Sequence, residues 1–298
     1  MRRKQIRDMR KLMIIIIVVV VSIISYAVQR VANTPKGIED SEFTVYYIDV
    51  GQGNAAYIDN GDKDILIDAG TAGSGDVLVN YLDILGVEHL EYFFVTHPHE
   101  DHIGGAAKVI DNFDIEHIIT TEADSDSYCY EDMIDAIDRE YIKFSYASSG
   151  DIYDIGGATV NVLSPAEGEY YDEDELNLSS LVLRVTYKDT CFVFAGDAEK
   201  KNEKYILENY DAKELKCDVL CVGHHGSNTS SGEKFLDALD PDICVISVGA
   251  GNDYGHPHSE TMVRLYDRTD KIYRTDRHGN IIICSNGKRV WAAEQNEK

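Results

Sequence analysis

Thr96-His97-Pro98-His99-Glu100-Asp101-His102 brings three histidines and two acids together within seven residues. The apolar run 92–96 is typical of a strand, and residues 103–112 have the period of a helix, so the motif stands where a strand ends. Histidines two apart in an extended turn can converge on one cation, while Asp101 and His102 can reach a second. Imidazole and carboxylate ligands together suit zinc, manganese or iron. The motif therefore predicts a metal centre.

The other histidines support this interpretation, because most of them also cluster. Seven of the ten lie in three short motifs, which are the turn above, His224-His225 and His256-Pro257-His258. Each later motif follows an apolar, strand-like run, at 219–222 and 243–248, so both are expected at one edge of a sheet. The solitary histidines are expected to be structural; they are His89, His117 and His278.

Hydrophobic periodicity predicts strands early in the chain and an alternation of helices and strands later. The expected strands are 43–50, 54–58, 64–67, 92–96, 115–120, 159–163, 181–187, 191–195, 219–222, 243–248 and 272–275, with a last hairpin over 281–291. The expected helices are 76–85, 103–112, 131–141, 199–208, 232–239 and 259–267. Residues 167–175 are acidic and irregular, as in an exposed loop. This order favours layered sheets with helices outside them.

The motifs resemble those of the metallo-β-lactamase superfamily. H-x-H-x-D-H followed by Ile103-Gly104-Gly105 is its signature, and Asp68, Asp197 and His224 stand where its further motifs are expected. The resemblance implies an α/β fold, a four-layer αββα sandwich with a site for two divalent metal ions, Zn²⁺ or Mn²⁺. The metal ligands it implies are His97, His99, Asp101, His102, Asp197 and His224, with Asp197 bridging the two ions.

Further motifs resemble the ComEC-type branch, the hydrolase domain attached to the bacterial competence DNA-uptake channel. They span residues 43–285 and are Tyr47–Gly53, Asn177–Leu183, Gly223–Ser227 with Thr229–Ser231, Tyr254–His258 and Arg274–Asp276. Residues expected to support the ligands or to contact substrate are Asp68, Asp49, Gln52, Asn177, His225, Ser227 and His258. Expected catalytic residues are Asp101, Asp197 and His256. A hydroxide held by the metals would attack, and His256 would protonate the leaving group.

Three departures from the family pattern matter. The third-motif histidine of the superfamily is missing near 177–180, which leaves the first metal weakly held unless the Asn177 side-chain oxygen helps. Asn54 stands where the branch usually has aspartate, so a carboxylate role there is lost. The chain also lacks the multi-helix channel, so DNA transport is not expected of it.

The N-terminus differs sharply from the rest of the chain. Residues 1–11 are basic and 12–28 carry no charge, which predicts a cytoplasmic tail and a single-pass transmembrane anchor of the cell membrane. Residues 29–41 are expected to be a linker, and 42–298 an extracellular hydrolase domain. The alternative is a signal peptide cleaved near 25–27, which would make the protein secreted.

Charge and cysteine usage limit the remaining function classes. The first forty residues hold eight of the 28 Lys and Arg but three of the 53 Asp and Glu, which leaves 20 basic and 50 acidic residues for 41–298. Such a body excludes a broad basic surface for nucleic acid. The six cysteines are expected to be structural, and those in apolar runs to be buried free thiols; they are Cys129, Cys191, Cys217, Cys221, Cys244 and Cys284.

The expected function is metal-dependent hydrolysis, with phosphodiester hydrolysis favoured. The substrate would be DNA or another phosphodiester polymer outside the cell. One alternative is a hydrolase of lactams, lactones or thioesters, because one scaffold can serve several reactions. Another is a metal-bound module that binds DNA or wall polymer without cutting. No protein partner can be inferred from the sequence.

Overall fold

The computed structural model describes residues 11–21, 36–61, 63–169 and 171–294. The chain divides into two units after residue 36. Residues 11–21 of the first unit form a helix. No helix in these four stretches is long and apolar enough to cross a membrane, so the predicted single-pass anchor and its location are wrong. Parts of the expected tail, anchor, cleavage site and linker, at 1–10 and 22–35, lie outside the described residues.

Two mixed sheets form the second unit, as its described residues show. The larger sheet has the order β15-β14-β1-β2-β3-β4-β5-β6. Its strands are β1 (Phe43–Tyr47), β2 (Ala56–Asp59), β3 (Ile65–Ile67), β4 (His89–Phe94), β5 (Asp114–Thr120), β6 (Lys143–Tyr146), β14 (Ile281–Ser285) and β15 (Val290–Ala292). Pairing is parallel from β3 through β6 and antiparallel elsewhere.

The smaller sheet has the order β13-β12-β11-β10-β9-β8-β7. Its strands are β7 (Ile152–Asp154), β8 (Ala158–Ser164), β9 (Val182–Tyr187), β10 (Thr190–Phe194), β11 (Val219–Cys221), β12 (Ile243–Ile246) and β13 (Ile272–Arg274). Pairing is parallel from β10 through β13. In each sheet, therefore, a run of parallel strands ends at one edge, where loops can meet.

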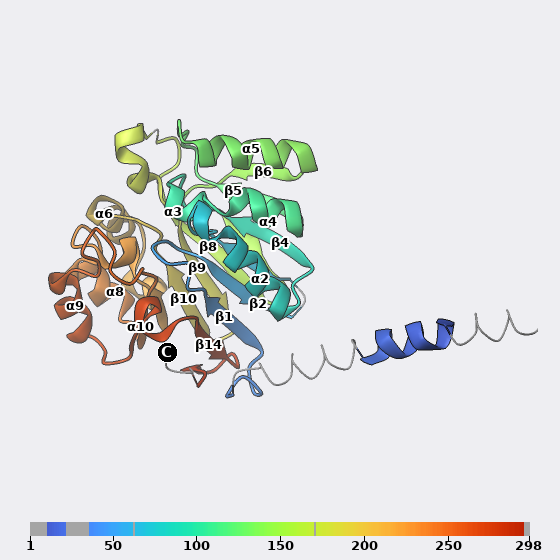
Figure 1. Ribbon diagram of the computed structural model, residues 1–298. Helices are drawn as coiled ribbons and strands as arrows, with labels where there is room; N and C mark the ends of the chain where they lie inside the picture. The colour runs from blue at the N-terminus through green and yellow to red at the C-terminus, as the bar shows by residue number, and fades with distance from the viewer. Residues whose placement is uncertain (1–10, 22–35, 62, 170, 295–298) are drawn as a thin grey trace, which may run out of the picture. The chain divides into compact units, whose positions relative to one another are not determined.

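Helices cover the outer faces of the two sheets (Figure 1). Over the larger sheet lie α2 (Gly75–Leu85), α3 (Glu100–Ile103), α4 (Ala106–Asn112) and α5 (Tyr128–Glu140). On the other side lie α6 (Lys200–Asn209), α7 (Ala212–Leu215), α8 (Glu233–Leu239), α9 (Ser259–Tyr266) and α10 (Thr275–His278). Short 3₁₀ turns lie in the connections between helices and strands; they are η1 (Ala72–Ser74), η2 (Glu173–Ser179) and η3 (Gly223–Gly226).

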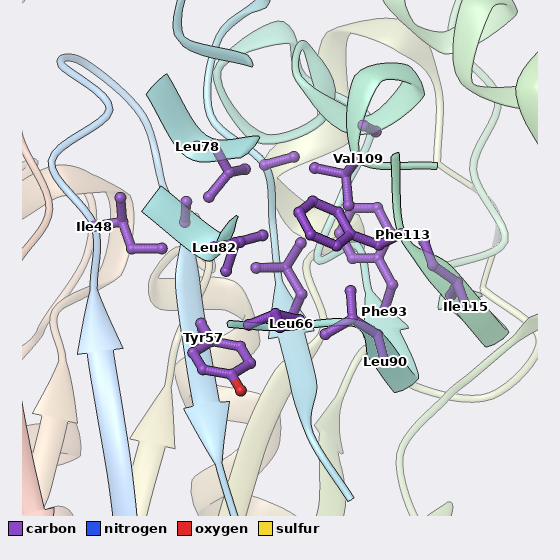
Figure 2. Packing of buried hydrophobic residues seen from close by; sticks show 14 of the residues in the cluster. Ile48, Tyr57, Leu66, Leu78, Leu82, Leu90, Phe93, Val109, Phe113 and Ile115 are labelled. Carbon is purple, nitrogen blue, oxygen red and sulfur yellow. The ribbon is translucent and has the colours of Figure 1, made fainter. Parts of the chain in front are cut away.

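Three apolar clusters hold these layers together. One lies between the larger sheet and its helices, where Leu78 and Leu82 of α2 contact a group that includes Leu66 and Phe93 (Figure 2). A second lies between the sheets, and a third between the smaller sheet and α6, α8 and α9. Burial of apolar surface stabilises the folded state by roughly 25 cal/mol per Å². The packing agrees with the expected sequence of helix, sheet, sheet and helix layers.

Most predicted elements are present, but one helix is not continuous. The expected helix over 103–112 is interrupted at Gly104 and Gly105, which separate α3 from α4. A Cβ on Gly104 would lie 2.1 Å from Ala72 N, so η1 packs against this point too closely for any side chain there. Strands β6 and β7 and helices α7 and α10 were not predicted. The six cysteines are free, and all but Cys129 are buried.

Candidate metal centre

The candidate site is built from loops that follow parallel strands of both sheets. Asp68 comes directly after β3, and the His-rich motif begins at Thr96, two residues after β4 ends. In the other sheet, Asp197 follows β10, and His224-His225 follow β11. The carboxyl ends of parallel strands share one edge, so residues more than a hundred positions apart meet there. The sequence prediction that these motifs share a sheet edge agrees with this arrangement.

The Asp197 carboxylate lies at the centre of the histidines. Its Oδ1 atom is 3.1 Å from His102 Nε2 and 3.6 Å from His225 Nε2. Its Oδ2 atom is 3.6 Å from His224 Nε2 and 3.9 Å from His97 Nε2. Each oxygen of one buried carboxylate therefore faces a different pair of imidazoles.

Two groups of candidate ligands follow from these distances. The ligand atoms of each group lie within 4.8 Å of one another; the groups are His97, His99 and Asp197, and Asp101, His102 and His225. His225 Nε2 also lies 3.1 Å from Asp101 Oδ2. The structure thus groups His225 with Asp101 and His102, whereas His224, the ligand predicted there, faces the other oxygen of Asp197.

Backbone conformation directs the two adjacent histidines to different atoms of the site. Both His224 and His225 have positive φ, 51° and 52°, within η3. Such left-handed conformations cost non-glycine residues of order 1–3 kcal/mol each and persist where surrounding structure enforces them. They turn two adjacent imidazoles toward opposite oxygens of Asp197. Spacing along the chain carries no signal for this arrangement.

Hydrogen bonds hold the imidazoles by the nitrogen that faces away from the centre. His102 Nδ1 lies 2.7 Å from Asp68 Oδ2, and His225 Nδ1 lies 2.8 Å from the carbonyl oxygen of Ser247. Both partners can only accept, so each Nδ1 carries a proton, which leaves Nε2 as the nitrogen through which each ring would bind a cation. Asp68 also accepts from Thr96 N and Thr96 Oγ1, at 2.7 and 2.9 Å. Sequence reasoning gave no role to Thr96, although this hydroxyl stands directly before His97.

Charge in the centre sets unusual protonation states. Burial opposes protonation of His102, but Asp197 and Asp68 outweigh it and raise the pKa of His102 well above its usual range. Burial likewise opposes protonation of His225, and Asp197 and Asp101 raise its pKa. The pKa of Asp197 is held well below its usual range, against burial, by the surrounding histidines. Without metal, protons on these imidazoles compensate the buried carboxylates.

The donor atoms fit a divalent cation. Among the described residues, His102 Nε2, His225 Nε2, Asp197 Oδ1 and Asn177 Oδ1 are buried without a hydrogen-bond partner. Such atoms are costly unless something satisfies them. Burial also lowers the pKa of His97 and His99, which keeps these imidazoles in the neutral form that binds metal. A cation would satisfy several of these atoms at once.

These residues face a cavity of about 370 Å³. Its lining is Gln52, His99, Glu100, Asp101, Asn177, Asp197, His224, His225, Tyr254 and His256. No lysine or arginine is among these lining residues. Tyr254 and Glu100 were not predicted as site residues, whereas the rest of the lining was.

Comparison with known proteins places the chain in a family. The "Metallo-beta-lactamase superfamily" profile matches residues 48–250. The chain belongs to the metallo-β-lactamase superfamily. Members of this superfamily are generally metal-dependent hydrolases.

Curated relatives confirm the resemblance to ComEC-type competence proteins. The chain is 30% identical over 259 residues to "ComE operon protein 3" of Bacillus subtilis (strain 168), covering 81% of the chain and 33% of the relative. It is 29% identical over 254 residues to "Competence protein ComA" of Neisseria gonorrhoeae, covering 84% and 33%. The chain therefore spans about a third of the length of these relatives.

Solved structures share the superfamily fold at low sequence identity. CmlA, "a diiron beta-hydroxylase from Streptomyces venezuelae", superposes with a TM-score of 0.55 at 13% identity, over 82% of this chain and 54% of that chain. The metallo-β-lactamase fold protein YhfI from Bacillus subtilis gives 0.51 at 12% identity, over 84% and 100%. These likenesses establish the fold alone.

Other residues predicted from superfamily motifs lie outside the cavity lining. Ser227 is buried, and its Oγ lies 3.1 Å from Thr229 Oγ1, so it supports a loop and does not face substrate. His258 Nδ1 accepts a hydrogen bond from Asn228 N at 3.0 Å, so this side chain, which directly precedes α9, is held by the loop that follows His225. Asp49 accepts from Gly51 N at 3.3 Å.

Residues 52–54, in and directly after the Gly-Gln-Gly sequence, contact the loops that carry site residues. Asn54 N donates to Asp101 O at 3.0 Å, and a Cβ on Gly53 would lie 2.3 Å from the same oxygen. The loop therefore supports Asp101 through its backbone, and this contact needs no carboxylate at position 54. Gln52 Oε1 accepts from Gly249 N at 3.2 Å, which joins this loop to the one that carries His256.

Metal affinity should keep rising with pH above 7. The raised pKa of His102 means that the metal-free site holds a proton that a cation must displace. An unperturbed histidine would cease to compete above about pH 6.5. Here we expect apparent affinity to rise about tenfold per pH unit for each proton released, through pH 8. Competition with a fluorescent chelator for Zn²⁺ at pH 6, 7 and 8 measures this.

The matched control is Asp68→Asn, which removes one of the two charges that raise the pKa of His102. In this variant the affinity should level off at lower pH. An affinity that is already constant between pH 7 and 8 in the unaltered protein would contradict the assignment of a bound proton.

Proposed function

We propose that the protein is a metal-dependent phosphodiesterase that cleaves DNA or another phosphodiester polymer. The observation that supports it is the position of Asp197, whose two oxygens face two separate groups of imidazoles in one cavity. Paired cation sites of this kind suit the displacement of one oxygen by another at phosphorus. The name of one relative, "Competence protein ComA", is consistent with DNA as the substrate.

In this proposal the chain's own residues hold two cations. His97, His99 and Asp197 Oδ2 would hold one, and Asp101, His102, His225 and Asp197 Oδ1 the other. Bound divalent cations supply an acidified water and polarise an oxygen of the substrate. The surrounding protein contributes orientation, because Asp68 and Ser247 keep the Nδ1 proton of His102 and His225 in place.

The low pKa of His256 argues against the proton-donor role predicted for it. Burial, with His224, His225 and His258 nearby, lowers the pKa of His256 to about 4. At pH 7 the imidazole is therefore neutral, and added cations would lower its pKa further. A neutral ring still has one N–H to donate, and its buried Nδ1 has no partner among the described residues. We infer that His256 stabilises the leaving oxygen by a hydrogen bond.

The test is a comparison of substrates on the purified protein supplied with Zn²⁺ or Mn²⁺. Bis-p-nitrophenyl phosphate, single-stranded DNA and the lactam nitrocefin are assayed side by side, with and without chelator. The proposal expects chelator-sensitive cleavage of the two phosphodiesters only. Cleavage of nitrocefin alone would indicate a lactam hydrolase. Binding of DNA by metal-loaded protein without cleavage would indicate a non-catalytic module.

Metal counting tests which adjacent histidine is the ligand beside Asp101. His225→Ala should lower the metal content toward one ion per chain after dialysis, because it removes one of the two imidazoles of the group that includes Asp101 and His102. His258→Ala is the matched control and should leave the metal content unchanged, since His258 belongs to neither ligand group and bonds to Asn228 N. Elemental analysis after dialysis gives the count. If His224→Ala loses an ion while His225→Ala keeps both, the assignment reverts to His224.

A further inference from the structure

The rim of the metal cavity carries an exposed aromatic ring. Tyr254 lines the cavity and is 65% exposed. Its ring is stacked on that of His256, with centroids 5.6 Å apart and planes at 21°. His256 is stacked in turn on His225, with centroids 6.3 Å apart and planes at 29°. A series of rings thus leads from solvent to a candidate metal ligand.

The loop that presents Tyr254 is held firmly. Gly255 has a φ of 72°, a left-handed turn that a glycine adopts without strain and that lies between the two stacked rings. Asn252 spans the turn, because its Oδ1 accepts from His256 N at 3.0 Å and its Nδ2 donates to His256 O at 2.7 Å. The same Nδ2 donates to Gly249 O at 3.0 Å. A ring ordered before binding loses little entropy on contact with a ligand.

Charge around the cavity excludes the usual means of holding a polyanion. The lining has no lysine or arginine, and Glu100 adds a negative charge. Phosphates on either side of the reacting one therefore find no cationic side chain in this lining. Contacts that hold a strand in the cavity must then be largely non-ionic. Stacking of bases on aromatic rings is such a contact, and it is worth roughly 1–3 kcal/mol per base.

We propose that the exposed face of Tyr254 is a stacking subsite for a nucleobase of the strand whose phosphodiester enters the metal cavity. The inference rests on the proposed phosphodiesterase function and narrows its substrate to a polymer that carries bases. A base-free phosphodiester polymer gains nothing from this ring. Every base has a flat face, so the subsite selects nucleic acid without selecting sequence.

The test is a cycle of two changes, one in the protein and one in the strand. Anisotropy measures the binding of a labelled single-stranded oligonucleotide, and of a strand of equal length with abasic residues, to chelator-treated protein. Tyr254→Ala should weaken binding of the ordinary strand by roughly 5- to 150-fold, the equivalent of one stacked base. The unaltered protein should bind the abasic strand as weakly as Tyr254→Ala binds the ordinary strand. Binding of the abasic strand by Tyr254→Ala should be no weaker than either of these.

Two further variants separate stacking from other effects. Tyr254→Phe keeps the ring and should bind like the unaltered protein. Tyr128→Ala removes a tyrosine of similar exposure, 76%, from α5 and should bind normally. Metal content of Tyr254→Ala should equal that of the unaltered protein, which shows that the fold is intact.

The outcomes distinguish this proposal from the one on which it rests. If Tyr254→Ala weakens binding of the abasic strand as much as that of the ordinary strand, the ring contacts sugar or backbone and the subsite is not for bases. If Tyr254→Phe is as weak as Tyr254→Ala, the hydroxyl matters and stacking is excluded. Base-dependent binding without any phosphodiester cleavage would support the subsite while refuting the phosphodiesterase. Phosphodiester cleavage together with binding that does not depend on bases would support the phosphodiesterase and refute the subsite.

Discussion

Replacing Asp197 by alanine should abolish hydrolysis and remove bound metal. The carboxylate faces imidazoles of both ligand groups, so its loss affects both proposed cation sites. It also leaves His102 and His225 without the main charge that raises their pKa. Cations contribute several kcal/mol to such reactions, so we expect a fall in kcat/KM of at least about a thousandfold. Turnover of bis-p-nitrophenyl phosphate and elemental analysis measure the two effects.

The control is Asp83→Ala, which removes an exposed carboxylate from α2 and should change neither quantity. His97→Ala should also abolish turnover, because His97 belongs to one ligand group. Full metal content in Asp197→Ala would show that this carboxylate is not shared between two cations. Full metal content together with lost activity would leave Asp197 a role toward substrate alone.

Gly104→Ala should destabilise the fold strongly. A Cβ on Gly104 would lie 2.1 Å from Ala72 N, 2.5 Å from the Thr71 carbonyl carbon and 2.6 Å from Glu100 O, all of them backbone atoms. Overpacking typically costs 1–3 kcal/mol, and backbone obstacles cannot rotate away, so we expect a loss of roughly 3 kcal/mol or more in the free energy of unfolding. Urea denaturation of the chelator-treated protein, followed by circular dichroism, measures this loss.

The comparison variant is Gly73→Ala, in the 3₁₀ turn η1, which Gly104 contacts through Ala72. A Cβ on Gly73 would meet only Thr71 Oγ1, at 3.9 Å, which is an ordinary contact. We expect its free energy of unfolding to change by no more than about 0.5 kcal/mol. If Gly104→Ala unfolds at the same urea concentration as the unaltered protein, close packing of η1 on the His-rich turn is not the reason for a glycine at position 104.

Local spacing was sufficient for the chemistry of the His-rich turn. His97, His99, Asp101 and His102 lie within six residues, so their approach depends on one turn, and the structure places them in two neighbouring ligand groups. The β9–β10 hairpin and the last hairpin were also predicted, because each depends on pairing between strands adjacent in sequence. Asp68 was predicted to support the ligands because it stands at a strand end, and its carboxylate lies beside His102.

Contacts between distant segments decided what spacing could not. Adjacent residues His224 and His225 face different oxygens of Asp197, because surrounding structure imposes left-handed backbone conformations on both. Burial lowers the pKa of His256, with His224 and His225 of another loop adding to it, and no local pattern reports that environment. The need for glycine at position 104 comes from the close approach of Ala72, some thirty residues earlier in the chain.

The sequence by itself therefore determined the kind of centre, because donor types and short spacings suffice to name it. The tertiary structure alone decided how the donors divide around Asp197 and which ring reaches solvent at the rim. The physical reason is the separation along the sequence of the residues that each kind of contact brings together. Turn geometry relates residues a few positions apart, whereas the positions of Asp197, His225 and Tyr254 depend on how two sheets and their loops pack.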